Sequence, residues 1–401
     1  MAEIKKVIFL GLGFPNVEKR NFLYSWLMLE FKRQGHDVLV LTADDNRKHS
    51  EVLMEGGLKV LRVPSTSLFG SNKLVKGISN VMLPYLYKRA LKKHNIAMDF
   101  DLILMPTPPI TLIDVVLWIK KKSNGKLYLI LRDIFPQNAV DLKMMKPKGF
   151  IHSFFRKKEI KLYQASDYIG CMSKANVDYV KKHNAYLNPQ KLHLLPNWAE
   201  LAEIDYADPN ATKAQFGLEG KIIAIFGGNM GKPQKLENII NLAKECQDLE
   251  DLVFFMVGRG TEKPRIAKMV KDFGLTNVII KDSLPKEEYN NLLSLADIGL
   301  ISLSQDFTIP NYPSKVLSYY MFKKPVLASV DINTDFGTDQ ERIQCGLWSE
   351  AGDIDAFKKN MMKLYKDENL RKQLGENGYQ YVTQNLTTEI AYKTIMSQLS
   401  Q

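Results

Sequence analysis

Short apolar runs alternate with amphipathic stretches along most of the chain, and this pattern predicts strands that alternate with helices. The runs in the first half, each expected as a strand, are Val7–Leu12, Val38–Thr42, Leu58–Val63, Leu102–Met105, Leu127–Leu131, Tyr168–Met172 and Leu192–Leu195. The second half restarts the series with Ile222–Phe226, Val253–Val257 and Val278–Ile280. Helical spacing predicts helices over Asn21–Gln34, from about Lys235 and from about Glu262. This alternation favours a parallel sheet covered on both faces, so the expected fold class is α/β.

A polar, acidic and turn-rich stretch, Ala199–Thr212, separates the two series and is the expected linker. A chain of 401 residues is long enough for two domains of ordinary size. We therefore predict one domain over residues 1–200 and a second over 201–385. The remaining helical segment, 386–401, is expected to pack back on the first domain.

The composition is that of a globular protein, with 45% hydrophobic and 25% charged residues. No stretch offers about 18 uncharged apolar residues, so no membrane span is expected, and the apolar N-terminus is interpreted as a first strand rather than a signal peptide. The three cysteines, Cys171, Cys246 and Cys345, are far apart. They indicate a reducing cytoplasm and argue against a disulfide framework and a zinc site. We expect no metal and no cofactor.

Positive charge is concentrated in the first half of the chain. Residues 1–200 hold 32 Lys and Arg against 17 Asp and Glu, a balance of +15, which leaves −4 for residues 201–401. Two basic stretches there, Asn72–His94 and Lys143–Lys161, have helical apolar spacing, and Pro84 is expected to kink or divide the first. Both could lie on an anionic membrane surface or simply bury one stripe in the core. Nucleic-acid binding would fit the charge, but no dedicated motif accompanies it.

The segment Thr308–Val330 predicts a loop, a helix entered at Ser314 and a short buried strand. With Ser314 as the N-cap, the N–H groups of Lys315 and Val316 would be free to bind an anion. An ordinary capped helix explains the same residues. Turns rich in glycine, over Gly227–Lys232 and Val257–Gly260, precede this segment in the same half of the chain.

Asp133 follows a predicted central strand directly. Ligands of open α/β sheets bind beyond the carboxyl ends of strands, so this carboxylate could act as a general base, or it could only cap a turn. The glycines Gly11 and Gly13, at the end of the first predicted strand, suggest a dinucleotide site. The third glycine of that fingerprint falls at Asn16, which argues against an oxidoreductase.

Nine motifs, in order along nearly the whole chain, resemble those of GT-B glycosyltransferases of family 4, in the branch that builds bacterial surface polysaccharides and includes N-acetyl-fucosamine-type transferases. They are GLGFPN with RQGHDVLVLTA, LILRDIFPQ, DYIGCMSKANVDYV, LLPNW, FGGNMGKPQKLENII, FMVGRGTE, LADIGLISLS, YPSKVLSYYMFKKPV and LGENGYQYV. The resemblance implies two Rossmann-like domains facing across a cleft. It implies that the second domain holds a nucleotide-sugar, with UDP favoured by the branch, and that the first domain holds the acceptor. The sugar would be transferred from one to the other with retention of configuration.

The resemblance also implies where the donor would bind. Its diphosphate is expected against Lys315 and Val316, with Ser314 as the cap, and against Gly231 and Lys232. Arg259 and Lys263 are further cationic candidates. Ser318 occupies the position of a glutamate that usually binds the ribose.

Several positions depart from the family pattern. Two glutamates eight residues apart are replaced by Pro310 and Ser318, and the usual Arg and Lys after the first strand of the second domain are Asn229 and Gln234. Gly11 and Gly13 are what remains of the glycine pair of the N-terminal loop. The missing glutamates leave open a second function, a partner subunit that binds nucleotide-sugar without catalysis.

The expected partners are a nucleotide-sugar and a polyprenyl-diphosphate-linked or glycan acceptor, with no nucleic acid. The resemblance and the basic first half together predict a cytoplasmic protein that is peripheral on the inner face of the cell membrane. The expected process is capsule or O-antigen biosynthesis.

Overall fold

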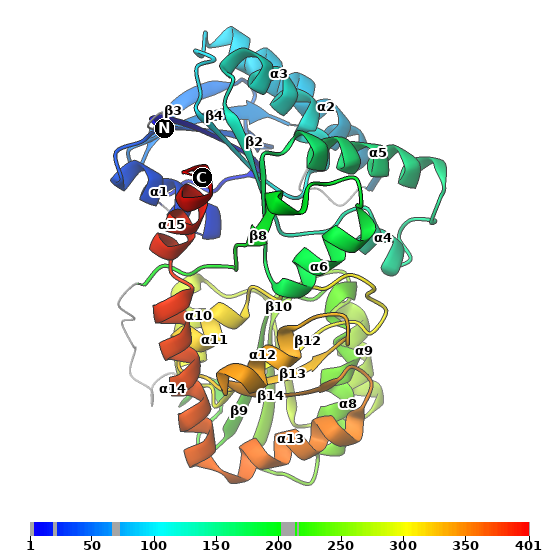
Figure 1. Cartoon of the computed structure of the whole chain (residues 1–401). Helices are drawn as coiled ribbons and strands as arrows, with labels where there is room; N and C mark the ends of the chain where they lie inside the picture. The colour runs from blue at the N-terminus through cyan, green and yellow to red at the C-terminus, as the bar shows by residue number, and fades with distance from the viewer. Residues whose placement is uncertain (1–3, 19–21, 66–72, 202–212, 215, 401) are drawn as a thin grey trace. The chain divides into compact units, whose positions relative to one another are not determined.

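A computed structural model describes residues 4–18, 22–65, 73–201, 213–214 and 216–400. The chain forms two compact units, residues 1–200 with 388–401 and residues 201–387. Each is built on a mainly parallel sheet with helices on its faces (Figure 1), which confirms the α/β class. Most of the predicted linker, residues 202–212, lies outside the described residues.

The N-terminal unit has an eight-stranded sheet in the order β3-β4-β2-β1-β5-β6-β7-β8. Its strands are β1 Lys6–Gly13, β2 Asp37–Asp44, β3 Glu51–Glu55, β4 Leu58–Pro64, β5 Leu102–Pro106, β6 Lys126–Leu131, β7 Tyr168–Cys171 and β8 Leu192–Leu194. All of these pairs are parallel except the β3–β4 hairpin. The edge strand β3 was not predicted, because a glutamate stands at each of its ends. Gly56 and Gly57, both with positive φ, make its turn into β4.

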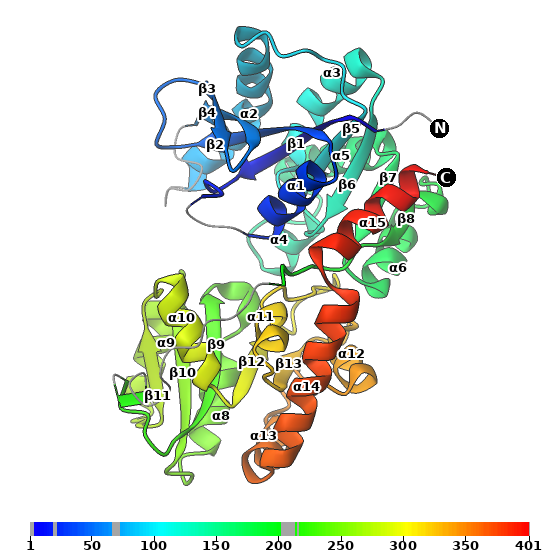
Figure 2. The same ribbon diagram turned by 90° about the vertical axis from the view of Figure 1, so that its left-hand side faces the viewer.

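The N-terminal unit carries helices on both faces of its sheet. They are α1 Leu23–Arg33, α2 Lys73–Lys93, η1 Ile110–Leu112, α3 Ile113–Ser123, α4 Gln137–Asp141, α5 Phe150–Ala165, α6 Lys174–His183, η2 Pro189–Lys191 and α15 Thr388–Leu399. The last of these, α15, packs beside α1 (Figure 2). Its residues Ala391 and Ile395 join the same core as Phe31, and Tyr392 Oη lies 2.8 Å from His36 Nε2.

One helix prediction in this unit was wrong, and of the two outcomes expected at Pro84, a kink or a division, the division is absent. The helix expected over Lys143–Lys161 begins only at Phe150, because Pro147 interrupts the preceding segment and Lys143 and Lys148 have positive φ. Pro84 does not divide α2, which is continuous. Buried residues on either side of the proline, Leu83, Tyr87 and Leu91, fix both parts of that helix against the unit.

The C-terminal unit has a six-stranded parallel sheet in the order β11-β10-β9-β12-β13-β14. Its strands are β9 Ile222–Asn229, β10 Leu252–Arg259, β11 Val278–Lys281, β12 Ile298–Ser302, β13 Val326–Val330 and β14 Gly346–Glu350. Its helices are η3 Lys232–Gln234, α8 Glu237–Glu245, α9 Lys263–Asp272, α10 Lys286–Leu295, α11 Val316–Met321, α12 Phe336–Ile343, α13 Ile354–Lys366 and α14 Glu368–Asn385. The near-continuous apolar runs of β9, β10 and β12 are buried on both faces, as expected for central parallel strands. The polar residues that could bind a ligand therefore lie at the ends of these strands.

Candidate functional site

The ammonium end of the Lys315 side chain is buried beside β9. Its Nζ lies 3.8 Å from the centroid of the Phe226 ring, and a Cβ atom placed on Gly228 would lie 3.8 Å from the same Nζ. Within the described residues this ammonium has no hydrogen-bond partner. Burial lowers the pKa of Lys315 to about 7, because the charged form is costly away from water. An anion bound beside Nζ would remove that cost.

Helix α11, which follows Lys315, is held against the central strands β9 and β12 by Tyr319. The Tyr319 hydroxyl lies 3.2 Å from the Ile225 carbonyl oxygen and 3.1 Å from that of Leu300. It also accepts a hydrogen bond from the Gly227 N–H at 3.4 Å. This buried tyrosine therefore fixes the backbone from which Lys315 reaches β9.

The predicted helix start at Ser314 was wrong. Helix α11 begins at Val316, and its N-cap residue is Lys315, whose side chain makes no capping hydrogen bond. The Val316 N–H donates to the Pro313 carbonyl at 3.3 Å, and the Leu317 N–H donates to the Ser314 carbonyl at 3.2 Å, so a turn precedes the helix. Val316 is consequently not free to bind an anion through its backbone. Ser318 is exposed on the first turn of α11.

Two glycines allow the ends of β9 and β10 to meet. A Cβ atom on Gly258 would lie 1.8 Å from the Gly228 carbonyl oxygen, and one on Gly260 would lie 2.2 Å from the Met230 carbonyl oxygen, so neither position accepts a side chain. Asn229 and Arg259 are register partners at the two strand ends. The structure thus brings two residues that are 30 apart in the sequence together at the carboxyl ends of their strands, directly after Gly228, which lies beside Lys315 Nζ.

The remaining residues predicted to bind the nucleotide-sugar differ in whether their polar groups already have partners. The Gly231 N–H donates to Gln234 Oε1 at 3.2 Å, so it is already occupied. Lys263 forms an ion pair with Asp282. Lys232 and Arg259 are exposed at the start of η3 and the end of β10.

Asp133 lies just beyond the carboxyl end of β6 in the N-terminal unit. Thr107 holds its backbone: the Thr107 hydroxyl donates to the Asp133 carbonyl at 3.0 Å and accepts from the N–H groups of Arg132 (3.0 Å) and Asp133 (3.2 Å). Burial raises the pKa of the Asp133 carboxyl to about 6. A carboxyl with this pKa can take up and release a proton near neutral pH.

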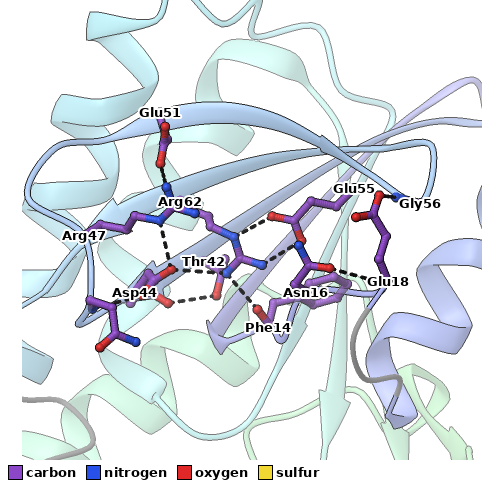
Figure 3. Close-up of polar contacts among 12 residues, drawn as sticks. Phe14, Asn16, Glu18, Thr42, Asp44, Arg47, Glu51, Glu55, Gly56 and Arg62 are labelled. Atoms are coloured by element: carbon purple, nitrogen blue, oxygen red, sulfur yellow. Dashed lines mark hydrogen bonds and ion pairs between the residues drawn. The ribbon is translucent and has the colours of Figure 1, made fainter.

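A buried ion pair fixes the loop that follows β1 (Figure 3), and Gly11 and Gly13 lie in the last part of that strand. Arg62 donates to both carboxylate oxygens of Glu55, at 2.6 and 2.7 Å, and to the Phe14 carbonyl at 3.0 Å. Asp44 lies 3.6 Å from the same guanidinium. The Tyr87 hydroxyl donates to the Gly11 carbonyl at 2.6 Å. The buried charges of this region are paired with one another, so they hold a loop in place.

Apolar side chains on α2 and α5 face solvent. The exposed ones on α2 are Ile78 (66%), Val81 (49%), Met82 (45%) and Tyr85 (59%), which are spaced to form one stripe. On α5, Phe150 is 90% exposed, with Ile151 and Phe154 also exposed. Helix α3 contacts both helices (Figure 1). In the described parts of the chain, no helix is both long and apolar enough to cross a bilayer.

A family model described as glycosyl transferases group 1 matches residues 209–381, the part of the chain that contains Lys315. These residues form a glycosyl transferases group 1 domain. Solved GT-B glycosyltransferases superpose on nearly the whole chain, which shows that the fold class is GT-B.

Two relatives and one solved structure illustrate the similarity. WbjE of Pseudomonas aeruginosa, named as a probable glycosyltransferase, is 23% identical over 65% of this chain and 65% of its own length. WcaI of Escherichia coli K12, named as a putative colanic acid biosynthesis glycosyl transferase, is 31% identical over 35% of this chain and 36% of its own. The alignments thus span less than two thirds of either relative. Anabaena HepE in complex with UDP and glucose superposes with a TM-score of 0.70 at 13% identity, covering 99% of each chain.

Three supporting residues escaped the sequence analysis. Phe226, beneath Lys315, reads only as the end of an apolar run, and Thr107 lies in a different loop from Asp133. Arg62 interrupts the apolar run of β4, which was the one available signal. A charged residue inside a buried strand requires a partner.

Proposed function

We propose that the chain is a retaining glycosyltransferase that moves a sugar from a UDP-sugar to a lipid-linked or glycan acceptor in surface-polysaccharide biosynthesis. The observation that carries the proposal is the buried ammonium of Lys315, which has no hydrogen-bond partner among the described residues, inside a glycosyl transferases group 1 domain. A diphosphate would supply the missing partner. UDP is favoured because HepE, which has a similar fold, binds it. Retention rests on the family resemblance, and no metal ion is part of the proposal.

On the donor side, Lys315 would bind the diphosphate and stabilise the charge that develops on it as the sugar departs. Lys232 and Arg259 would assist from the solvent side, and Asn229 would contribute an amide. In this class the departing phosphate is thought to assist attack on the same face of the sugar. The charge on Lys315 would therefore serve both binding and catalysis.

On the acceptor side, Asp133 would accept the proton of the attacking hydroxyl or orient it. Two observations support this role: Thr107 fixes its backbone, and its pKa lies near 6. A general base works best when its pKa is close to the working pH.

The N-terminal unit would dock on an anionic membrane that carries the acceptor. The exposed apolar stripe of α2 is followed by Lys88, Arg89, Lys92 and Lys93, and the exposed residues of α5 follow three further lysines. Apolar insertion together with roughly 1 kcal/mol per cationic side chain is enough for reversible binding. The protein would then be peripheral on the cytoplasmic face.

The donor site is tested by replacing Lys315 with methionine, which keeps the apolar stem and removes the charge. The expected result is a rise of roughly 10- to 100-fold in the Kd for UDP-sugar by calorimetry, from losing roughly 1.5–3 kcal/mol of charge-assisted hydrogen bonding. Lys244→Met is the matched control, since that exposed lysine also lies over a phenylalanine ring, at 4.8 Å. Unchanged affinity in a folded Lys315→Met protein would refute the donor site.

Membrane docking is tested by co-sedimentation with anionic vesicles at low salt. Reversal of Lys88, Arg89, Lys92 and Lys93 to glutamate should release the protein, because each engaged cation contributes about 1 kcal/mol. The control reverses four lysines of α13, Lys358, Lys359, Lys363 and Lys366, and should still sediment. Equal binding of both variants would exclude α2 as the docking helix.

The second function, a non-catalytic partner that binds nucleotide-sugar, draws on the replacement of the usual glutamates by Pro310 and Ser318. Incubation with UDP-sugars and an acceptor extract separates the two. A subunit without catalysis would bind the donor but release no UDP.

A further inference from the structure

A cavity of about 160 Å³ lies within the N-terminal unit, between the start of α4 and helices α5 and α6. Ile134 and Pro136, which line one wall, come directly after Asp133 in the chain. Polar side chains complete the lining: Gln137, His152, Arg156, Glu159, Tyr179, His183 and Asn184. The cavity therefore adjoins the segment that carries the proposed base.

The charges in this cavity are already balanced. Glu159 is buried and forms an ion pair with Arg156, whose other terminal nitrogen donates to the Asn184 side chain at 2.8 Å and the His183 carbonyl at 3.2 Å. These contacts tie α5 to the end of α6 and commit the one arginine of the described lining. A phosphate would meet the Glu159 carboxylate without an unpaired positive charge to offset it. The cavity thus favours a neutral ligand.

The two histidines of the lining, His152 and His183, suit a carbohydrate. Tyr179 and His183 stack with ring centroids 4.0 Å apart, and His183 Nδ1 lies 2.9 Å from the Tyr179 carbonyl oxygen, which leaves Nε2 for a ligand. No described residue forms a hydrogen bond with the His152 imidazole. Imidazole nitrogens can pair with hydroxyl groups as donors or acceptors, and Ile134 and Pro136 offer an apolar wall to C–H groups. A single sugar ring needs this combination of polar and apolar contacts.

A row of aromatic rings in contact with one another connects this wall to the exposed end of α5. The ring of Phe135 lies 4.9 Å from that of Phe155, and Phe155 lies 5.2 Å from Phe154, which is solvent-exposed. A molecule with a sugar in the cavity could therefore extend an apolar part along α5. That is the form of a glycolipid.

We propose that the cavity binds a neutral sugar residue of the acceptor, so that the acceptor already carries at least one sugar when it arrives. This rests on the proposed function and defines it further: the reaction extends a glycan. A separate transfer of the first sugar to the lipid must precede it. His152 and His183 would contact the bound sugar, and Arg156 with Glu159 would keep the two helices in position.

Histidine NMR tests the cavity without requiring transfer. The chain has six histidines, so ring signals labelled with ¹³C can be assigned by single His→Gln variants. Methyl glycosides of glucose, galactose and N-acetylglucosamine are titrated to about 50 mM, a range suited to weak binding. At least one should shift the signals of His152 and His183 saturably and leave those of His36 and His94 unmoved. Inorganic pyrophosphate is titrated in a separate experiment, to test whether the cavity binds an anion instead of a neutral sugar.

Kinetics with a lipid-linked acceptor provide the second measurement. His152→Gln should raise the acceptor KM at least fivefold and leave the slow hydrolysis of UDP-sugar in water unchanged, whereas His94→Gln should alter neither. Absence of glycoside shifts, or shifts with pyrophosphate alone, would overturn the proposal. Failure of the proposed function would look different, because UDP-sugar would neither bind nor be hydrolysed by the unmodified protein.

Discussion

The N-terminal unit contains a buried charge that is fully paired, whereas the C-terminal unit has one without a partner among the described residues. Arg62 is 5% exposed and satisfied by Glu55, Phe14 and Asp44. Lys315 Nζ is also buried, lies over the face of Phe226 and has no hydrogen-bond partner among the described residues. Paired charges hold a loop in place, while an unpaired charge lowers stability until a ligand arrives. The difference supports the proposed donor site without reference to sequence motifs.

The largest expected effect comes from breaking the paired charge. Arg62→Met should lower the free energy of unfolding of the N-terminal unit by about 3–5 kcal/mol, because it leaves the Glu55 carboxylate buried alone. Chemical denaturation measures this value. The double variant Arg62→Met with Glu55→Leu should recover most of the loss. If the double variant were no better than the single one, packing rather than charge would explain the loss.

Removing the proposed base should affect rate and leave stability nearly intact. Asp133→Asn should lower turnover about 100-fold while donor affinity stays within about twofold. In the unmodified protein, turnover should fall as pH drops below about 6, since the carboxyl then holds a proton. The Asp133→Asn variant should lose this pH dependence. Asp178→Asn, an exposed carboxylate on α6, is the control, and ordinary turnover in the Asp133→Asn protein would reduce Asp133 to a structural role.

Removing the unpaired charge should have the opposite sign on stability. Lys315→Met should raise the free energy of unfolding by about 1–3 kcal/mol at pH 6, because an unsatisfied buried donor disappears. The same variant should bind UDP-sugar more weakly. A loss of stability similar to that of Arg62→Met would show that Lys315 is paired in solution, and the contrast between the two units would fail.

The smallest expected effect is a pH dependence of the stability gained by the Lys315→Met variant. The pKa of Lys315 is about 7 in the folded protein and 10.5 in an unfolded chain, so the unfolded state binds more protons between these values. The buried charge of Lys315 destabilises the folded protein fully below about pH 7, and this destabilisation disappears as pH rises toward 10. The stability difference between Lys315→Met and the unmodified protein should therefore shrink over this window. UDP-sugar affinity should weaken over the same range toward the value of the Lys315→Met variant, because the neutral amine no longer carries the charge, and calorimetry in two buffers should detect proton uptake.

The sequence by itself determined the α/β class, the succession of the main strands along the chain and the place of Asp133 at a strand end. Central parallel strands are buried on both faces, so their apolar runs are visible without tertiary information. The edge strand β3 has polar ends and was missed. Periodicity also favoured a helix from Lys143, which the backbone conformation of Lys143 and Lys148 prevents.

Only the tertiary structure decided which candidates are buried and which are already paired. Lys315 depends on Phe226, nearly ninety residues earlier, and Lys263 is committed to Asp282 on a neighbouring loop. The cavity beside Asp133 needs side chains from three elements between Ile134 and Asn184. Desolvation and pairing depend on neighbours that are distant along the chain, and local sequence patterns carry no record of them.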